Sequence, residues 1–455
     1  MTRRVAAAAA AVLWTVAAAD PVLAHGIGGR IDLPVPRWLF VFGAATALVI
    51  SFVLLGALWR EPRFPLPRRR GGDGPLQAEL RNPAVEWTLR LLALAWFLVV
   101  AGSALTGAST GATIAPVAVF IWFWVGGAFV QAFLGDWWAT LSPFDTLGRL
   151  FGLDYAGEEP PHRYPARLGT WPAAIGLFAF VWLELVDPFG GRPGSLGLCL
   201  VVYTAAQIAG MARYGRAAWV RDGETFSVYL GLLARISPLR RDDEGRVVVV
   251  APVASLAEVA TRPGLLALVL VALGSTTFDG ASRTALWRET VAPFHGLPLV
   301  AASTAGLLLA IGVVAALYAL AMRAAAASGG RSWRELAADF AHTLVPIAFA
   351  YVVAHYFSYL LIEGQIGIAR VSDPFGLGWD LLGTADRPVE LAIVGPATVW
   401  YVQVAAIVLG HVAGVVLAHD LALRRFPGPG ALRTQFALLA VMVLFTAGGL
   451  LILSG

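Results

Sequence analysis

The chain of 455 residues is 58% hydrophobic and only 14% charged, which leaves too little polar surface for a soluble globular protein of this length. All 33 basic side chains are arginine, so the sequence excludes enzyme classes that need an active-site lysine, including P-loop nucleotide hydrolases and pyridoxal enzymes. The net charge of +4 comes from arginines grouped between apolar runs, a pattern that favours contact with anionic membrane lipid and argues against a nucleic-acid partner.

The first residues have the pattern of a secretory signal segment. Two arginines precede an apolar run over 6–19, and Val22 and Ala24 fit the two positions that a signal peptidase reads. We therefore expect a signal peptide or a signal-like helix over 1–24. The remainder, 25–455, is predicted to be a single polytopic membrane domain, because no long polar block interrupts its apolar runs.

Apolar runs of about 20 residues, the length that crosses a bilayer, recur along the rest of the chain. Tryptophans near the ends of several runs support this interpretation, because the indole ring prefers the membrane interface. The sequence thus predicts an all-α fold, a polytopic transmembrane helical bundle of about ten spans. We expect the spans at roughly 38–59, 85–107, 114–135, 170–187, 194–213, 263–279, 297–322, 338–361, 397–419 and 431–453.

Arginines are concentrated in alternate connections between these runs, and the intervening connections are short or acidic. The arginine-rich connections are 60–81, 149–167, 213–262 and 323–334. Because cytoplasmic loops are enriched in arginine, these connections are predicted to face the cytoplasm, and both mature termini are predicted to lie outside. Two stretches, 137–151 and 217–239, are predicted to lie along the cytoplasmic membrane surface.

Ionisable side chains inside the predicted spans are candidates for function, since each costs several kcal/mol in lipid unless it is paired. Two of them are carboxylates, Asp279 and Glu184, which we assign as candidate catalytic residues. With a rise of about 1.5 Å per residue, Asp279, Glu184 and His355 fall in the outer half of the membrane, where they could share one pocket. The alternative for Asp279 is a helix-terminal turn that faces water.

Histidines are the candidate metal ligands: His342, His355 and His411 within spans, and His295 in the adjoining outer loop. A divalent metal, zinc or copper, would activate water there. The alternative is that each histidine is hydrogen-bonded between helices as a packing group, because no closely spaced histidine pair marks a metal motif. His342 and His355 also lie on helix faces about 140° apart, unless the helix bends at Pro346.

Three further patterns have local consequences. Signal cleavage would place His25 at the new N-terminus, where its amino group and imidazole could chelate copper. Gly410 and Gly414 have the spacing that lets two helices approach closely. Tyrosines at 351 and 359 form a stripe with His355 that is expected to face protein, not lipid.

Segments 25–36, 342–357 and 410–420 read HGIGGRIDLPVP, HTLVPIAFAYVVAHYF and GHVAGVVLAHD. With these segments the chain resembles bacterial polytopic membrane proteins known as membrane-bound fenitrothion hydrolases, and the resemblance covers essentially the whole mature chain. It implies hydrolysis of an organophosphate triester by a multi-pass protein of the bacterial cytoplasmic (inner) membrane. It transfers no catalytic residue.

Two functions from different classes are consistent with these patterns. The first is an integral membrane hydrolase that uses metal-bound hydroxide to cleave an apolar phosphoester dissolved in lipid, a reaction that needs no lysine. The second is a transporter or channel whose buried histidines and carboxylates move protons or bind a cation. A third, weaker hypothesis is a scaffold or copper-handling factor that uses His25. Membrane lipid and an apolar small molecule are the expected partners.

Overall fold

The computed structural model describes residues 37–64, 82–108, 112–155, 158–242, 244–327, 331–426 and 431–454. Nearly all of the regular structure in these ranges is helical, which confirms the predicted all-α polytopic bundle. Nine helices of the described chain are long and apolar enough to cross a membrane. The predicted signal segment and His25 lie outside the described residues.

The membrane-spanning helices begin and end close to the predicted runs. They are α2 (Arg37–Leu58), α4 (Pro83–Thr106), η1 with α5 (Val117–Gly126 and Gly127–Leu134), α9 (Pro193–Tyr214), α12 (Leu265–Ser282), α14 (Leu297–Ala326), η3 with α16 and α17 (Ala341–Leu344, Val345–Ile362 and Gly364–Ser372), α18 (Pro396–Arg425) and α19 (Ala431–Ser454). The remaining predicted span is α8 (Trp171–Leu185), whose 15 residues reach only about 22 Å. α8 is therefore shorter than the ~30 Å hydrocarbon core of a bilayer.

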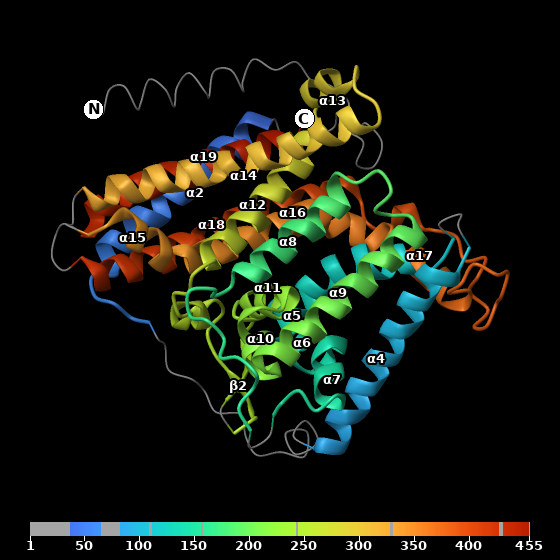
Figure 1. Cartoon of the computed structure of the whole chain (residues 1–455). Coiled ribbons are helices and arrows are strands. Elements are labelled where there is room, and N and C mark those ends of the chain that lie inside the picture. The colour runs from blue at the N-terminus through green and yellow to red at the C-terminus, as the bar shows by residue number, and fades with distance from the viewer. Residues whose placement is uncertain are drawn as a thin grey trace.

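Helix α12 occupies the middle of the bundle. It packs against α14 and α16 on one side and against α8 on the other, so it joins the group α2, α14, α16, α18 and α19 to the group α4, α8 and α9 (Figure 1). Its apolar residues are buried accordingly, with Leu268 fully enclosed. This central position explains why a carboxylate on α12 can contact side chains from both groups.

Helices α16 and α18 lie side by side over much of their length. Gly410 and Gly414 permit this approach: a Cβ atom at Gly410 would lie 2.3 Å from the Cβ of Ala350, and one at Gly414 would lie 2.9 Å from the carbonyl oxygen of Thr343. Any larger side chain would push the helices apart. The close approach predicted from this glycine pair is confirmed.

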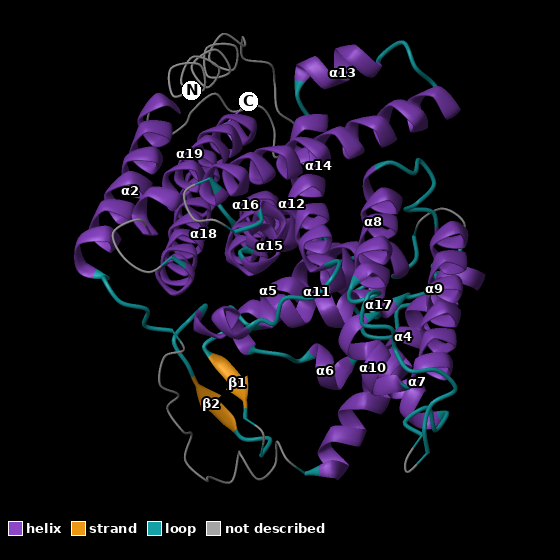
Figure 2. Ribbon diagram, turned by 60° about the vertical axis from the view of Figure 1, so that its left-hand side comes forward, coloured by secondary structure: helices purple, strands orange, loops and turns teal. Residues whose placement is uncertain are grey.

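Short elements occupy the two ends of the molecule (Figure 2). Helix α13 (Ala285–Val291) lies at one end, which we call the α13 end. The opposite end, the hairpin end, carries the antiparallel strands β1 (Leu239–Arg241) and β2 (Val247–Val249) with α6 (Trp138–Leu141), α7 (Pro143–Leu150) and α10 (Arg216–Asp222). By the predicted orientation the α13 end is external and the hairpin end cytoplasmic. The remaining short elements are η2 (Ala254–Glu258), α15 (Trp333–Asp339) and η4 (Leu391–Ile393).

Helix α11 (Thr225–Ala234) departs from the prediction that 217–239 lies along the membrane surface. Eight of its 10 residues are buried, and it packs against α5 and α8 inside the protein. Its Tyr229 stacks on Trp124, with ring centroids 5.1 Å apart. The surface prediction is wrong for this helix, because α11 is mostly apolar and is covered by the protein on nearly all of its faces.

Candidate functional site

Asp279 stands at the centre of a buried polar cluster towards the α13 end. It lies near the end of α12 and is only 4% exposed. Two residues of the neighbouring α16 contact the same carboxylate oxygen: Nε2 of His355 lies 2.7 Å from Oδ2, and the hydroxyl of Tyr356 donates a hydrogen bond to Oδ2 at 2.9 Å. We call Asp279, His355 and Tyr356, together with Arg283 and Glu184, the Asp279 cluster.

Arg283 and Glu184 complete this cluster. Arg283 follows Asp279 by one helical turn and donates to Oδ1 at 3.1 Å, with half of its side chain exposed. Glu184 is partly buried on α8, close enough to Asp279 and Arg283 for their charges to interact. The structure thus brings together Asp279, Glu184 and His355. These are the three residues that were predicted, from their positions along the helices, to lie in the outer half of the membrane.

The charges of the Asp279 cluster do not balance on their own. Two carboxylates face one permanent cation, so the cluster carries one negative charge when both carboxylates are ionised and the His355 imidazole is neutral. An unbalanced charge among apolar helices is costly. Uptake of one proton, on His355 or Glu184, or of one bound cation would make the cluster neutral. The arrangement is therefore suited to accept and release a single positive charge.

The contact of His355 with Asp279 is an ion-pair contact, not an aligned hydrogen bond. The two atoms are 2.7 Å apart, yet Nε2 makes no hydrogen bond of regular geometry with any described residue. The imidazole packs edge-on against the ring of Tyr356, with centroids 4.9 Å apart. The hydrogen bonds that hold the carboxylate therefore come from Tyr356 and Arg283.

His411 lies apart from the Asp279 cluster. It is fully buried on α18, where Nδ1 donates to the carbonyl oxygen of Ile407 at 2.8 Å, a bond that fixes the proton on Nδ1. The other ring nitrogen, Nε2, has no partner among the described residues and borders a small cavity of about 20 Å³. That volume has room for one water molecule. Tyr351 and Thr277 are polar residues on the cavity wall.

His342 and His295 also lie outside the Asp279 cluster. His342 is buried in the 3-10 turn η3, and α16 begins directly afterwards at Val345 with Pro346 in its first turn. The bend expected at Pro346 is thus a change of helix type that separates His342 from His355. His295 is exposed in the loop between α13 and α14.

The predicted metal ligands do not converge. In the part of the chain that the structure describes, no three histidine, cysteine or carboxylate side chains gather closely enough to hold a metal ion. The histidines are separated because each lies on its own helix face or at its own depth. A bound zinc or copper ion stays a prediction, and the Asp279 cluster is the place where two of its expected ligands, Asp279 and His355, meet.

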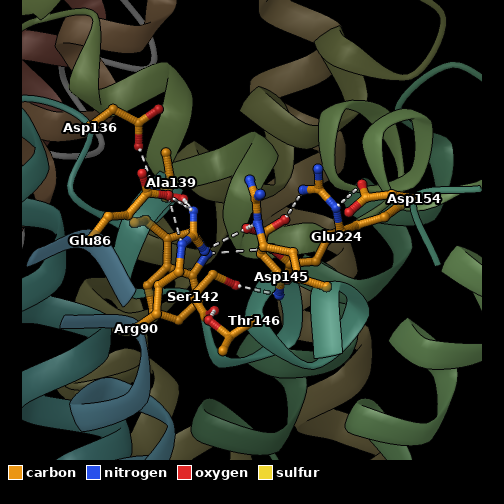
Figure 3. Close-up of polar contacts among 12 residues, drawn as sticks. Glu86, Arg90, Asp136, Ala139, Ser142, Asp145, Thr146, Asp154 and Glu224 are labelled. Atoms are coloured by element: carbon orange, nitrogen blue, oxygen red, sulfur yellow. Dashed lines mark hydrogen bonds and ion pairs between the residues drawn. The ribbon is translucent and has the colours of Figure 1, made fainter. Parts of the chain in front are cut away.

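A second buried network, centred on Asp145, lies at the hairpin end (Figure 3). Asp145 of α7 is 3% exposed and receives three arginines: Arg90 at 2.7 Å, Arg149 at 3.1 Å and Arg216. Arg90, itself 3% exposed, also donates to Glu86 at 2.8 Å and to the carbonyl oxygen of Ala139 at 3.2 Å. We call this set the Asp145 network.

Both carboxylate oxygens of Asp145 are paired with arginines, and Asp145 lies in the first turn of α7. Ser142 is the N-cap of α7, and its Oγ accepts a hydrogen bond from the Asp145 backbone N–H at 3.2 Å. Burial by itself would raise the pKa of Asp145, but the charges of Arg216 and Arg149 outweigh it and hold that pKa below its ordinary value. The network therefore keeps one charge state at neutral pH, as expected of a structural element.

Polar residues at the hairpin-side end of α18 also have structural partners. Oδ1 of Asp420 accepts hydrogen bonds from Nε1 of Trp59 at 3.2 Å and from the backbone N–H groups of Arg63 and Phe64. His419 bridges the Trp59 carbonyl oxygen, at 2.9 Å, to a side chain of α19. These contacts connect the segment that follows α2 with α18. Both ring nitrogens of His419 are occupied by them.

Sequence reasoning missed two members of the Asp279 cluster and misplaced one side chain. Tyr356 was not singled out although it follows His355, and Arg283 was overlooked although the spacing of four residues from Asp279 is the usual signal of a helical ion pair. Tyr359, expected to face protein, is 41% exposed, so that prediction is wrong. Tyr351 does face protein, and its hydroxyl donates to the carbonyl oxygen of Phe445 at 2.8 Å.

No protein-family model, no curated protein and no solved structure matches the chain. The functional argument consequently depends on the Asp279 cluster itself.

Proposed function

We propose that the protein is a transporter that moves protons, or a small cation in their place, through the membrane, with the Asp279 cluster as its ion-binding site. The observation that carries the proposal is a buried carboxylate, Asp279, in contact with His355 and Arg283 and close to a second carboxylate, Glu184, between apolar helices. A carboxylate inside a membrane is tolerated when it is paired or when it carries an ion as part of its work. Asp279 is paired with Arg283 and lies 2.7 Å from His355, with which it makes no aligned hydrogen bond.

The position of the cluster supports this proposal. Asp279 and His355 belong to α12 and α16, which pack against each other, while Glu184 reaches them from α8. An ion bound there contacts three helices, so a change in the packing of any of them alters the access of that ion to either side. Arg283 connects the cluster to the α13 end through its half-exposed side chain.

The test is ion flux in proteoliposomes that contain the full chain and a trapped pH-sensitive dye, driven by a potassium diffusion potential. Asp279→Asn keeps the shape of the side chain and an acceptor for Tyr356 but removes the charge. We expect it to abolish flux, and Glu289→Gln, which neutralises an exposed carboxylate of α13, to leave flux at the wild-type rate. Wild-type flux in correctly folded Asp279→Asn protein would refute the proposal.

A membrane hydrolase is the second candidate, and the contact of His355 with Asp279 favours it, because a histidine oriented by a carboxylate is a common general base. In that proposal Glu184 or a divalent metal would assist attack by water on an apolar phosphotriester, as the resemblance to fenitrothion hydrolases implies. The cavity of about 600 Å³ at the hairpin end is lined by no residue of the Asp279 cluster, so we rank this function second. Release of nitrophenol from a phosphotriester that His355→Gln abolishes would reverse the ranking.

A further inference from the structure

A cavity of about 600 Å³ opens at the hairpin end of the protein. Its walls come from α4, α10 and the buried helix α11, from the residues that follow α5, from the β1–β2 hairpin and from the segment that leads into α12. The cavity belongs to neither the Asp279 cluster nor the predicted metal ligands.

Arginines dominate the charge of this cavity. Six line it, against two carboxylates, Glu86 and Asp136; the arginines are Arg90, Arg221, Arg235, Arg240, Arg241 and Arg262. Four of the six form ion pairs with three carboxylates, Arg90 with Asp145, Arg221 and Arg262 both with Asp222, and Arg240 with Glu258. The remaining two have no ion pair with any described residue.

Arg235 and Arg241 are these two. Arg235 donates one hydrogen bond, to the carbonyl oxygen of Ser255 at 3.1 Å, out of the five N–H groups that a guanidinium carries. Burial, and then the charges of neighbouring arginines, lower the pKa of Arg235, so a nearby anion would stabilise its charged form. Asp136 interacts with both arginines through space, and Glu258, the ion-pair partner of Arg240, also interacts with Arg235. Three arginines thus share two carboxylates, which leaves one positive charge in excess.

Apolar side chains form the other part of the cavity wall. Leu134, the last residue of the spanning helix α5, lines it and is 53% exposed, and Leu265, the first residue of α12, lines it from another side. Since both helices enter the membrane at these residues, the cavity lies at the level of the membrane surface. It thus offers positive charge next to apolar surface.

We infer that this cavity is a binding site for a phosphate group, bound by Arg235 and Arg241 and carried by an anionic phospholipid or by a soluble phosphate compound. The planar guanidinium matches phosphate oxygens with two parallel hydrogen bonds, which an ammonium group cannot do. The site is independent of the proposed ion transport, because it shares no residue with the Asp279 cluster.

The experiment measures binding to the purified full chain in two arms. In the first, native mass spectrometry compares retention of phosphatidylglycerol with that of phosphatidylcholine. In the second, inorganic phosphate is titrated while the thermal unfolding of lipid-free protein is followed. Both arms use wild type, Arg241→Gln, Arg235→Gln/Arg241→Gln and the control Arg163→Gln, whose side chain is 84% exposed and is not part of the cavity wall.

We expect wild type and Arg163→Gln to bind at least one of the two ligands, Arg241→Gln to bind it about tenfold more weakly, and the double variant to bind it no better than Arg241→Gln. Retention of phosphatidylglycerol alone identifies a lipid site. An increase of the Tm with inorganic phosphate alone identifies a site for soluble phosphates. The inference is overturned if wild type binds neither ligand, if it retains both lipids equally, or if Arg241→Gln, whose exposed side chain makes misfolding no concern, binds like wild type.

Discussion

The Asp145 network and the Asp279 cluster are both buried, both centred on an aspartate and both contacted by arginine, yet they differ in how completely they are paired. Asp145 is held by three guanidinium groups and caps the start of α7. Asp279 has one guanidinium, one tyrosine hydroxyl and an imidazole that makes no aligned hydrogen bond.

This difference separates structural charge from functional charge. A fully paired carboxylate has a single stable protonation state, and any change to it costs folding free energy. A carboxylate beside an imidazole that makes no aligned hydrogen bond has one partner that can be exchanged for a bound ion at a smaller cost in hydrogen bonds, which is what ion binding requires. Burial of a charge therefore does not show whether its role is structural or functional. The hydrogen-bond and ion-pair partners of each of its atoms distinguish the two roles.

The largest expected effect is on stability, from Asp145→Ala. Removal of this carboxylate leaves Arg90 buried without its main partner, a situation that costs about 3–5 kcal/mol. We expect a variant that gives little monodisperse protein in detergent, or one with a strongly lowered Tm. A Tm close to that of wild type would show that the Asp145 network is not structural.

Acid should weaken the Asp145 network by a smaller amount. Because the folded pKa of Asp145 is lowered, its stabilisation is fully present above the ordinary value of 3.8 and is lost as the pH falls below 3.8 through the folded pKa. Between pH 7 and pH 3.8 we expect the titration of Asp145 to leave the Tm of wild type unchanged. Below pH 3.8 we expect the Tm to decrease. Asp145→Asn, measured in parallel, should show a shallower fall, since the titrating group is absent.

Asp279→Asn should lower stability less than Asp145→Ala or acid does. It should have a larger effect on ion flux. The amide can still accept the hydrogen bond of Tyr356, so we expect a loss of about 1 kcal/mol or less in unfolding free energy. Proteoliposome flux should disappear in the same preparation. A variant that unfolds like Asp145→Ala would place Asp279 with the structural charges and break the comparison.

The smallest effect is expected at the exposed ion pair of Arg163 and Glu159. Both side chains are in solvent, with 84% and 76% of their surfaces exposed, so water and salt screen their attraction. Arg163→Gln should leave Tm and flux at the wild-type values. A measurable loss there would mean that exposure is a poor guide to the energy of ion pairs in this protein.

Most of the fold could be predicted because it depends on local properties. Run length and hydropathy place the spanning helices, and the Gly410–Gly414 spacing predicts the close approach of α18 to α16. Helix α11 escaped prediction because a short apolar segment between arginine-rich flanks has the same local composition whether it lies on the membrane or within the protein.

The candidate site could be predicted only in part, for a related reason. Depth along each helix places Asp279, Glu184 and His355 at one level, but depth says nothing of the direction in which His342 and His411 point. The Asp145 network joins residues 55 and 71 positions apart in the chain, and pairing at such separations leaves no periodic signal in a single sequence.

The link between Asp420 and the end of α2 has a consequence for biosynthesis. Trp59 and Asp420 are 361 positions apart, which at ~5–20 residues per second separates their emergence from the ribosome by roughly 20–70 s. Throughout that interval α2 has been synthesised while α18 and α19, the helices it packs against, have not. One of the earliest helices to enter the membrane is thus among the last to dock, and an insertion factor or chaperone has about a minute in which to hold it.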